Sequence, residues 1–274
     1  MGKRDKRKRK HKYTAETADK HQLYELSVQC VEADLDLMEK TFRKKRKRHP
    51  RLLKEDFCGT AKASAEFVSR HKKNRAWGVD LDESVLEWGM KHNIAPLGKA
   101  AKRVTLIHDN VLHVTQPKVD VTLALNFSYF IFKERKDLVH YFKQAYKGLK
   151  SDGIFFIDMY GGTEAQDEME EKTKKKHFTY VWDQYRYDPV TNEVLNYIHF
   201  DFPDGTRMKR AFEYDWRLWT VKELTEALID AGFASADVYW EGWDDDCQEG
   251  DGKFKKVLSA ESSAGWVSYI VAAK

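Results

Sequence analysis

The sequence is poor in cysteine, in proline and in long apolar runs. Its 274 residues include three cysteines and five prolines. Cys30, Cys58 and Cys247 are odd in number and far apart, without a Cys-x-x-Cys pair, which argues against a disulfide framework or a zinc site. No apolar run reaches about 18 residues, and no basic stretch precedes an apolar leader. We therefore expect a soluble, cytoplasmic protein with no membrane partner and no metal site.

Charge is distributed unevenly along the chain. Residues 1–12 carry eight Lys/Arg against one Asp, and RKKRKR at 43–48 adds six positive charges. Because the whole chain carries +4, the remainder is net acidic. Basic segments of this kind can bind nucleic acid, but like-charge runs more often stay unfolded and solvated. We expect residues 1–12 to be a disordered arm, and nucleic-acid contact through it and through 43–48 stays open.

Length and patterning favour one large α/β domain with additions, since 42% of the residues are apolar and 13% aromatic. Residues 14–42 place apolar side chains at mostly helical spacing, which predicts an amphipathic helix with at most one break. Residues 13–49 are therefore taken as an N-terminal helical segment, and residues 50–274 as the main domain.

Strands and helices are expected to alternate after Pro50. The expected strands are RLLKEDF, RAWGVDL, RVTLIHD, VDVTLALNF and GIFFIDMY, with helices beginning near Ala61, Ser84 and Glu134. Apolar strands of this length separated by helices indicate βαβ units, and hence a parallel sheet covered on both faces.

The rhythm changes at residues 177–216. Three aromatic, alternating runs are joined there by the turn sequences DPVTN and PDGT, which predicts an inserted antiparallel sheet of three strands. The next segment begins with a capping box of Thr220 and Glu223 and predicts a helix. Two final strands, ASADVYWEG and GWVSYIVAAK, are expected to pair antiparallel.

The segment LLKEDFCGTA has the pattern of a strand, a tight turn and a helix. Such a turn forms the first crevice of a doubly wound sheet, where ligands bind beyond the carboxyl ends of the strands. About 20 residues later the second strand ends at Asp80, whose two carboxylate oxygens can accept hydrogen bonds from two ribose hydroxyls. This pair fits any nucleoside cofactor, and a simple helix N-cap is the alternative for Asp80.

The segment from Glu55 to Ala61 resembles the first motif of class I S-adenosylmethionine-dependent methyltransferases, whose usual form is acid-x-Gly-x-Gly-x-Gly. The later elements follow in the same order: Asp80, His108-Asp109-Asn110, Asn126-Phe127-Ser128 and a terminal antiparallel hairpin. The resemblance covers residues 50–274, and DFCGTA with WGVDLD is similar to a bacterial branch of that family. It implies a Rossmann-like α/β methyltransferase sheet, mostly parallel, with the insertion as an antiparallel β lid.

Two of the three glycine positions hold Phe57 and Ala61, and only Gly59 remains. A dinucleotide site needs close approach of the backbone to a pyrophosphate, which we expect Phe57 to obstruct. S-adenosylmethionine has no phosphate. The loss of two glycines from the motif therefore argues more strongly against a dinucleotide-dependent oxidoreductase than against a methyltransferase.

The resemblance also implies which residues bind S-adenosylmethionine. Glu55 would orient the methionine amino end, and Gly59 would let the backbone approach it. Asp80 would bind the ribose hydroxyls, with Leu81 against the adenine face. The other implied contacts are Asp109 and Asn110 at the adenine edge, Asn126 at the methionine amino group, and Tyr24 on the N-terminal segment that closes over the site.

The insertion is the expected substrate lid. Aromatic walls with a few polar groups make a small-molecule pocket and can stabilise a cationic amine. Tyr180, Trp182, His199 and Trp216 are the candidate substrate contacts, and His199 and Tyr197 are the candidate bases. An ordinary aromatic sheet core is the alternative for these residues, a turn carboxylate for Asp109, and a strand-end cap for Asn126.

The hypothesis is methyl transfer to a nitrogen or oxygen of a small molecule, which mainly requires alignment, exclusion of water and a base. The segment NFSY at 126–129 lacks the prolines of the Asn/Asp-Pro-Pro-Tyr/Phe motif that marks methylation of bases and amides in the family. Two alternatives remain: an RNA or protein methyltransferase docked by the basic arm, and a non-catalytic Rossmann-like nucleotide-binding protein.

Overall fold

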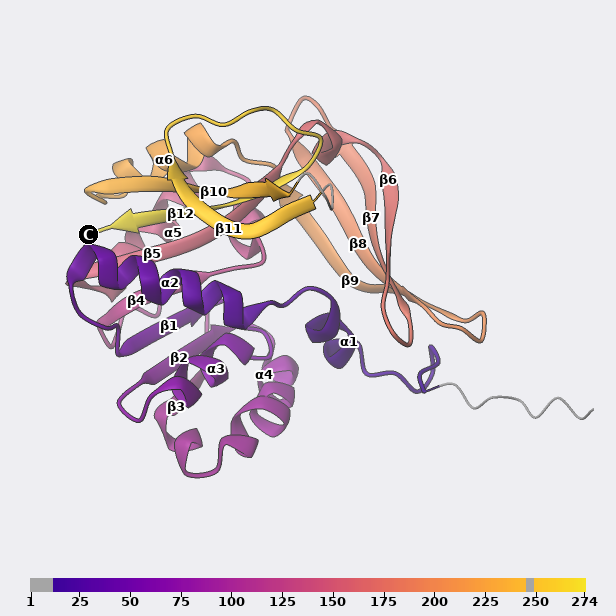
Figure 1. The fold of residues 1–274 in the computed structure, drawn as a ribbon, viewed down its shortest axis with the longest axis horizontal. Helices are drawn as coiled ribbons and strands as arrows, with labels where there is room; N and C mark the ends of the chain where they lie inside the picture. The colour runs from indigo at the N-terminus through magenta and orange to yellow at the C-terminus, as the bar shows by residue number, and fades with distance from the viewer. Residues whose placement is uncertain (1–11, 245–248) are drawn as a thin grey trace, which may run out of the picture.

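The computed structural model describes residues 12–244 and 249–274 and contains two sheets (Figure 1). The main sheet has eight strands in the order β11-β10-β12-β5-β4-β1-β2-β3. The second sheet has four, in the order β6-β7-β8-β9. The predicted basic arm, residues 1–12, lies outside the described residues except for Lys12.

Five parallel strands form the larger part of the main sheet, as the apolar runs predict. They are β1 (Leu52–Asp56), β2 (Arg75–Asp80), β3 (Val104–His108), β4 (Val119–Ala124) and β5 (Leu149–Gly161). Because β1 lies between β2 and β4, the strand order reverses at β1. The carboxyl ends of β1 and β4 therefore border the crevice in which such sheets bind ligands.

Three further strands complete the main sheet: β10 (Ser235–Asp244), β11 (Glu249–Val257) and β12 (Trp266–Ala273). β12 pairs antiparallel with both β5 and β10, which confirms the predicted antiparallel pair. β11 was not predicted, because EGDGKFKKV is rich in glycine and charge and has the composition of a loop. It pairs with the outer edge of β10.

Helices cover both faces of the main sheet. They are α1 (Lys20–Ser27), α2 (Val31–Arg46), α3 (Lys62–Arg70), α4 (Glu83–Gly89), α5 (Arg135–Gly148) and α6 (Val221–Asp230), with short helical turns η1 (Met90–Ile94), η2 (Ala95–Arg103), η3 (Ser128–Ile131) and η4 (Thr163–Gln166). Ala124 packs in one core with Phe142 of α5, and its neighbour Leu123 packs in a second core with Phe67 of α3. Successive side chains of β4 thus point to opposite faces of the sheet, and both faces are buried.

The N-terminal helix is broken once, between Ser27 and Val31. Asp19 caps α1 by accepting hydrogen bonds from the N–H groups of His21 and Gln22. The capping box of Thr220 and Glu223 is present at the start of α6, as the sequence predicts.

The second sheet, named here the lid sheet, consists of β6 (Met169–Lys174), β7 (Thr179–Asp188), β8 (Glu193–Asp201) and β9 (Arg207–Arg217). It stands at one end of the main sheet, with α1 beside it (Figure 1). The sequence predicts β7 to β9 but not β6, because all six side chains of β6 are exposed and most are charged. An edge strand held by backbone pairing needs no apolar alternation.

Part of the basic run at 43–48 is used inside the molecule. Lys45 forms an ion pair with Asp237, and Arg48 forms ion pairs with Asp120 and Asp152. These side chains are therefore not free to contact phosphates. No helix in the described ranges is long and apolar enough to cross a membrane.

Candidate functional site

The turn after β1 has a left-handed backbone at the three positions that are glycine in the usual motif, although only Gly59 is a glycine here. Phe57, Gly59 and Ala61 all have left-handed backbones, with φ of 55°, 49° and 55°. This conformation costs a residue with a side chain roughly 1–2 kcal/mol. The Phe57 ring packs against Phe132 and Tyr141, with centroids 6.2 and 5.5 Å away. Because the ring is anchored in the core, its placement does not support the obstruction of a pyrophosphate expected from the sequence.

The Glu55 carboxylate caps the N-terminus of α3. Ala61, the N-cap of α3, has no side-chain oxygen, and the Glu55 carboxylate replaces it by accepting hydrogen bonds from Ser64 N (2.8 Å) and Ser64 Oγ (2.5 Å). The side chain is buried, and burial raises the pKa of this carboxyl to about 7. The N-terminus of α3, which holds the pyrophosphate in dinucleotide sites, is thus already capped from within the protein.

Replacing Glu55 by glutamine should flatten the pH dependence of stability. A carboxyl whose pKa rises from 4.5 to about 7 on folding stabilises the folded state at low pH, and that contribution is lost as the pH rises through this window. As the pH rises through this window, the unfolding free energy of Glu55→Gln relative to the parent should increase by about 1.4 kcal/mol per pH unit. Above the window this difference should stay constant. Urea unfolding at several pH values measures this, and parallel profiles for the two proteins would contradict it.

Asp80 connects the end of β2 to the turn. Its Oδ2 accepts a hydrogen bond from Gly59 N (2.7 Å), and its Oδ1 accepts one from Asp82 N (3.0 Å). The helix cap of α4 is Asp82, which accepts from Ser84 N and Val85 N, so the N-cap alternative for Asp80 is wrong. Each carboxylate oxygen retains a further lone pair for an added donor.

An open cleft lies beside Asp80 and is lined by Leu81, Ser84 and His108 among others. Leu81 is 60% exposed and leaves an apolar surface next to the Asp80 carboxylate. His108 Nε2 lies 3.0 Å from the Leu81 carbonyl oxygen. An apolar side chain beside a free acceptor is suited to a nucleoside, whose base is flat and whose sugar carries hydroxyls.

Asp109 and Asn110 follow β3 at the same edge, where Asp109 N donates to Asp80 O (3.1 Å). Both side chains serve the local turn. Asp109 Oδ1 accepts from Asn110 N and lies 3.0 Å from His113 Nδ1, and Asn110 Oδ1 accepts from Leu112 N. The geometry agrees with the turn-carboxylate alternative for Asp109, and its contact with an adenine stays a prediction.

A second left-handed turn ends β4. Asn126 and Phe127 have φ of 56° and 59°, and both backbone N–H groups donate to the carboxylate of Asp158, at 2.8 and 3.0 Å. Asp158 is buried, and burial raises its pKa to about 7. This residue was not predicted as part of the site. Its signal in the sequence is a lone acid inside the apolar run GIFFIDMY.

A cavity of about 880 Å³ opens next to this turn, between the end of β5 and the lid sheet. Five residues predicted from the sequence come together on its wall: Tyr24, Asn126, Tyr180, Trp182 and Trp216. Tyr160 and Tyr214 also line it and were not predicted. We call this space the aromatic cavity.

His199 and Tyr197 do not line the aromatic cavity, although the sequence places them among the candidate bases and substrate contacts. Trp182 is paired with Ile198 across β7 and β8, whereas Asp183 is paired with Tyr197. Since neighbouring residues of a strand point to opposite faces, Tyr197 and His199 lie on the outer face of the lid sheet. Sequence alternation alone could not identify the inner face, because both faces of β8 carry large apolar or aromatic side chains.

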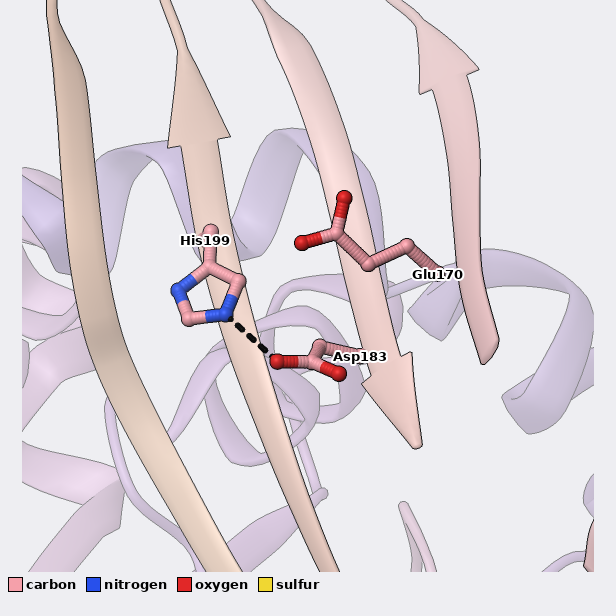
Figure 2. A group of neighbouring side chains, drawn as sticks. All are labelled: Glu170, Asp183 and His199. Atoms are coloured by element: carbon pink, nitrogen blue, oxygen red, sulfur yellow. Dashed lines mark hydrogen bonds and ion pairs between the residues drawn. The ribbon is translucent and has the colours of Figure 1, made fainter. Parts of the chain in front are cut away.

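On that outer face His199 is held by hydrogen bonds (Figure 2). Its Nδ1 accepts from Arg210 N (2.7 Å), so the neutral ring carries its hydrogen on Nε2, which lies 3.0 Å from Asp183 Oδ2. Glu170 completes a group whose possible metal-binding atoms lie within 4.8 Å of one another. Glu170 also accepts from Arg207 Nη2 (2.6 Å). A metal would need the Nε2 lone pair and the Glu170 charge, and both are engaged, so the group is a hydrogen-bonded ion-pair network.

Comparison with solved structures identifies the fold. An S-adenosylmethionine-dependent methyltransferase from Clostridium acetobutylicum superposes with a TM-score of 0.67 and 16% identity. The match covers 91% of this chain and 96% of that one. An amino pentose methyltransferase from Micromonospora echinaspora, with S-adenosylmethionine bound, matches with a TM-score of 0.64 and 13% identity, over 92% of this chain and 95% of that one.

A sugar N-methyltransferase from Streptoalloteichus matches with a TM-score of 0.62 and 14% identity, over 100% of this chain and 98% of that one. No protein-family model matches the chain, and no curated protein sequence is detectably similar to it. At these identities the similarity shows a shared fold, and the chain has the fold of class I methyltransferases.

Proposed function

We propose that the protein is an S-adenosylmethionine-dependent methyltransferase that modifies a nitrogen or oxygen of a small molecule. The observation that carries the proposal is that a cleft and a cavity lie at the carboxyl ends of the parallel strands, the cleft after β2 and the cavity after β4. The open cleft, of about 650 Å³, lies at Asp80, where the N-terminus of α3 is already capped by Glu55, and the aromatic cavity is lined by Asn126. The three solved structures described above are of methyltransferases, which supports the same activity.

S-adenosylmethionine supplies a methyl group already activated by a sulfonium. Asp80 would accept the ribose hydroxyls, and Leu81 would cover the adenine. Gly59 would allow backbone approach to the methionine end, and Asn126 would bind its amino group. Glu55 acts indirectly, by fixing the start of α3 and thus the turn. The methyl would face the aromatic cavity, and alignment and exclusion of water are the main contributions that the protein must make.

In the same proposal, different segments of the chain cover the cofactor and select the acceptor. Residues 13–49 would cover the cofactor, since Tyr24 of α1 lines the aromatic cavity. The lid of residues 177–216, extended by β6 from Met169, would select the acceptor. The basic arm would not be needed for small-molecule turnover. The cytoplasmic location stays a prediction.

Trp182→Ala should lower kcat/KM for the acceptor at least tenfold, because Trp182 walls the aromatic cavity and excludes water from it. Affinity for S-adenosylhomocysteine should stay within a few-fold. Tyr185→Ala is the matched control, because Tyr185 lies on the same strand as Trp182 but packs edge-to-face against Tyr197 on the outer face of the lid sheet. A screen of metabolite pools with labelled S-adenosylmethionine supplies the acceptor for the measurement.

Deleting residues 1–12 should leave this turnover unchanged. If the deletion abolishes methyl transfer to a cellular RNA fraction while Trp182→Ala has no effect, the protein is a macromolecular methyltransferase and the small-molecule proposal fails. If labelled methyl groups reach no acceptor although the cofactor binds, the protein is a non-catalytic binder.

A further inference from the structure

The charged residues of the aromatic cavity are all acidic. Among the described residues, Glu164, Glu171, Glu241 and Glu261 line it, and no lysine, arginine or histidine does. The chain as a whole has 48 basic residues against 44 acidic ones, so a random patch of this size would carry both signs. The cavity therefore presents a local excess of negative charge to whatever enters it.

These four carboxylates have no basic partner in the part of the chain that the structure describes. The contrast is sharpest within β6. Glu170, on the outer face, is bound by Arg207 and Lys172, whereas Glu171, its neighbour in sequence, points to the cavity without an ion pair. Glu241 accepts one hydrogen bond, from Gly252 N at 3.1 Å. Glu241 is half-buried, whereas Glu164, Glu171 and Glu261 are exposed. A group of carboxylates without counter-charges favours a cation in the cavity, most strongly beside the half-buried one.

Aromatic rings line the same cavity. Tyr214 lies 5.8 Å from Trp182 and 4.4 Å from Trp216, and Tyr160 lies 6.4 Å from Trp182, each measured between ring centroids. Trp240 and Trp266, 4.6 Å apart, add a second aromatic pair at the cavity. Faces of such rings attract cations, with tryptophan the strongest, and the attraction increases when water is excluded.

We infer that the acceptor of this methyltransferase is an amine that carries a positive charge when it enters the aromatic cavity. The inference rests on the proposed function and narrows it from nitrogen or oxygen to an amine nitrogen. Unpaired carboxylates attract the ammonium, and the rings of Trp182, Tyr214 and Trp216 surround its alkyl groups. A phosphate or carboxylate group would meet repulsion from the same four glutamates, which also disfavours RNA.

The chemistry balances with groups already named. The bound ammonium first gives a proton to a cavity carboxylate or to water, which frees the nitrogen lone pair. That pair forms the new nitrogen–carbon bond to the methyl group as the carbon–sulfur bond breaks. The electrons of the broken bond stay on sulfur and the positive charge passes to nitrogen, so the products are the methylated ammonium and S-adenosylhomocysteine. No oxidant, reductant or metal is needed.

The test uses the full chain saturated with S-adenosylhomocysteine and three probes of one shape: benzylammonium, benzyl alcohol and benzoate. Tryptophan fluorescence or calorimetry gives each dissociation constant. Benzylammonium should bind at least about tenfold more tightly than benzyl alcohol, and benzoate should bind least. The double variant Glu171→Gln/Glu241→Gln should lose at least about fivefold of the ammonium affinity, with the alcohol affinity unchanged.

Glu170→Gln is the matched control, because it removes one negative charge from the same strand but on the outer face; its probe affinities should equal the parent's. Equal or tighter binding of benzyl alcohol or benzoate, or no binding of any probe, would overturn the inference. Binding of S-adenosylhomocysteine is measured first. If S-adenosylhomocysteine does not bind, the proposed function itself is wrong. If it binds but the three probes do not follow the expected order of affinities, only the amine inference is wrong.

Discussion

Replacing Asp80 by alanine should lower the affinity for S-adenosylhomocysteine at least about 100-fold. In the proposed site the variant would lose two charge-assisted hydrogen bonds to the ribose, each worth about 1.5–3 kcal/mol. The substitution also removes the acceptor for Gly59 N (2.7 Å), in the turn proposed to hold the methionine end. Titration calorimetry on the parent and the variant measures the effect, and unchanged affinity would mean that the ribose binds elsewhere.

Asp82→Ala is the matched control for Asp80→Ala. It removes a carboxylate two residues away that caps α4 through Ser84 N and Val85 N. Loss of an N-cap costs about 1 kcal/mol of stability, so the control should melt at a lower temperature while it binds the cofactor product within a few-fold of the parent. If both variants lose affinity equally, the effect comes from α4 and not from a ribose contact.

Lys54→Met should lower the free energy of unfolding by about 3–5 kcal/mol. Lys54 and Asp56 are almost fully buried in β1, with Lys54 Nζ 3.1 Å from Asp56 Oδ1. Tyr141 Oη donates to the second oxygen of Asp56 (3.0 Å), and Lys54 Nζ donates to Val114 O (2.9 Å). Methionine has nearly the shape of lysine, so the loss reflects a buried carboxylate left without its counter-charge. Urea unfolding measures it.

The double variant Lys54→Met/Asp56→Asn should recover most of that loss, because it leaves no buried charge and keeps an acceptor for Tyr141. Lys222→Met is the control for an exposed ion pair, because the side chains of Lys222 and Glu226 are 80% and 55% exposed. It should lower the free energy of unfolding by less than about 1 kcal/mol. A cost below about 1 kcal/mol for Lys54→Met, or no recovery in the double variant, would show that the buried pair is not ionised in the folded protein.

The features that could be predicted from sequence are those in which composition and position agree. VDVTLA is mostly apolar and forms β4, which is buried on both faces. Asp80 ends the mostly apolar strand β2 and lies in the cleft, as its position predicts. β6 and β11 were missed because their stability comes from backbone pairing, which leaves no apolar pattern. Their side chains, mostly charged or glycine, have the composition of loops.

The environments of two candidate site residues depend on packing and register that the sequence pattern does not show. Glu55 has the position of a cofactor ligand in its motif, but Ala61 cannot cap α3, so the carboxylate is turned to Ser64. His199 has a suitable residue type for a base, but the strand register turns it towards Asp183 and away from the cavity. Residue type can be read from the chain, whereas the face of a two-sided strand is decided by what packs against it.

The most direct test of the account is a pair of calorimetric titrations of the full chain, one with S-adenosylhomocysteine and one with NAD. A class I methyltransferase site built on Asp80, with α3 capped by Glu55, should bind S-adenosylhomocysteine with one site per chain and give no heat of binding with NAD. Binding of NAD together with no response to S-adenosylhomocysteine would contradict the central claim.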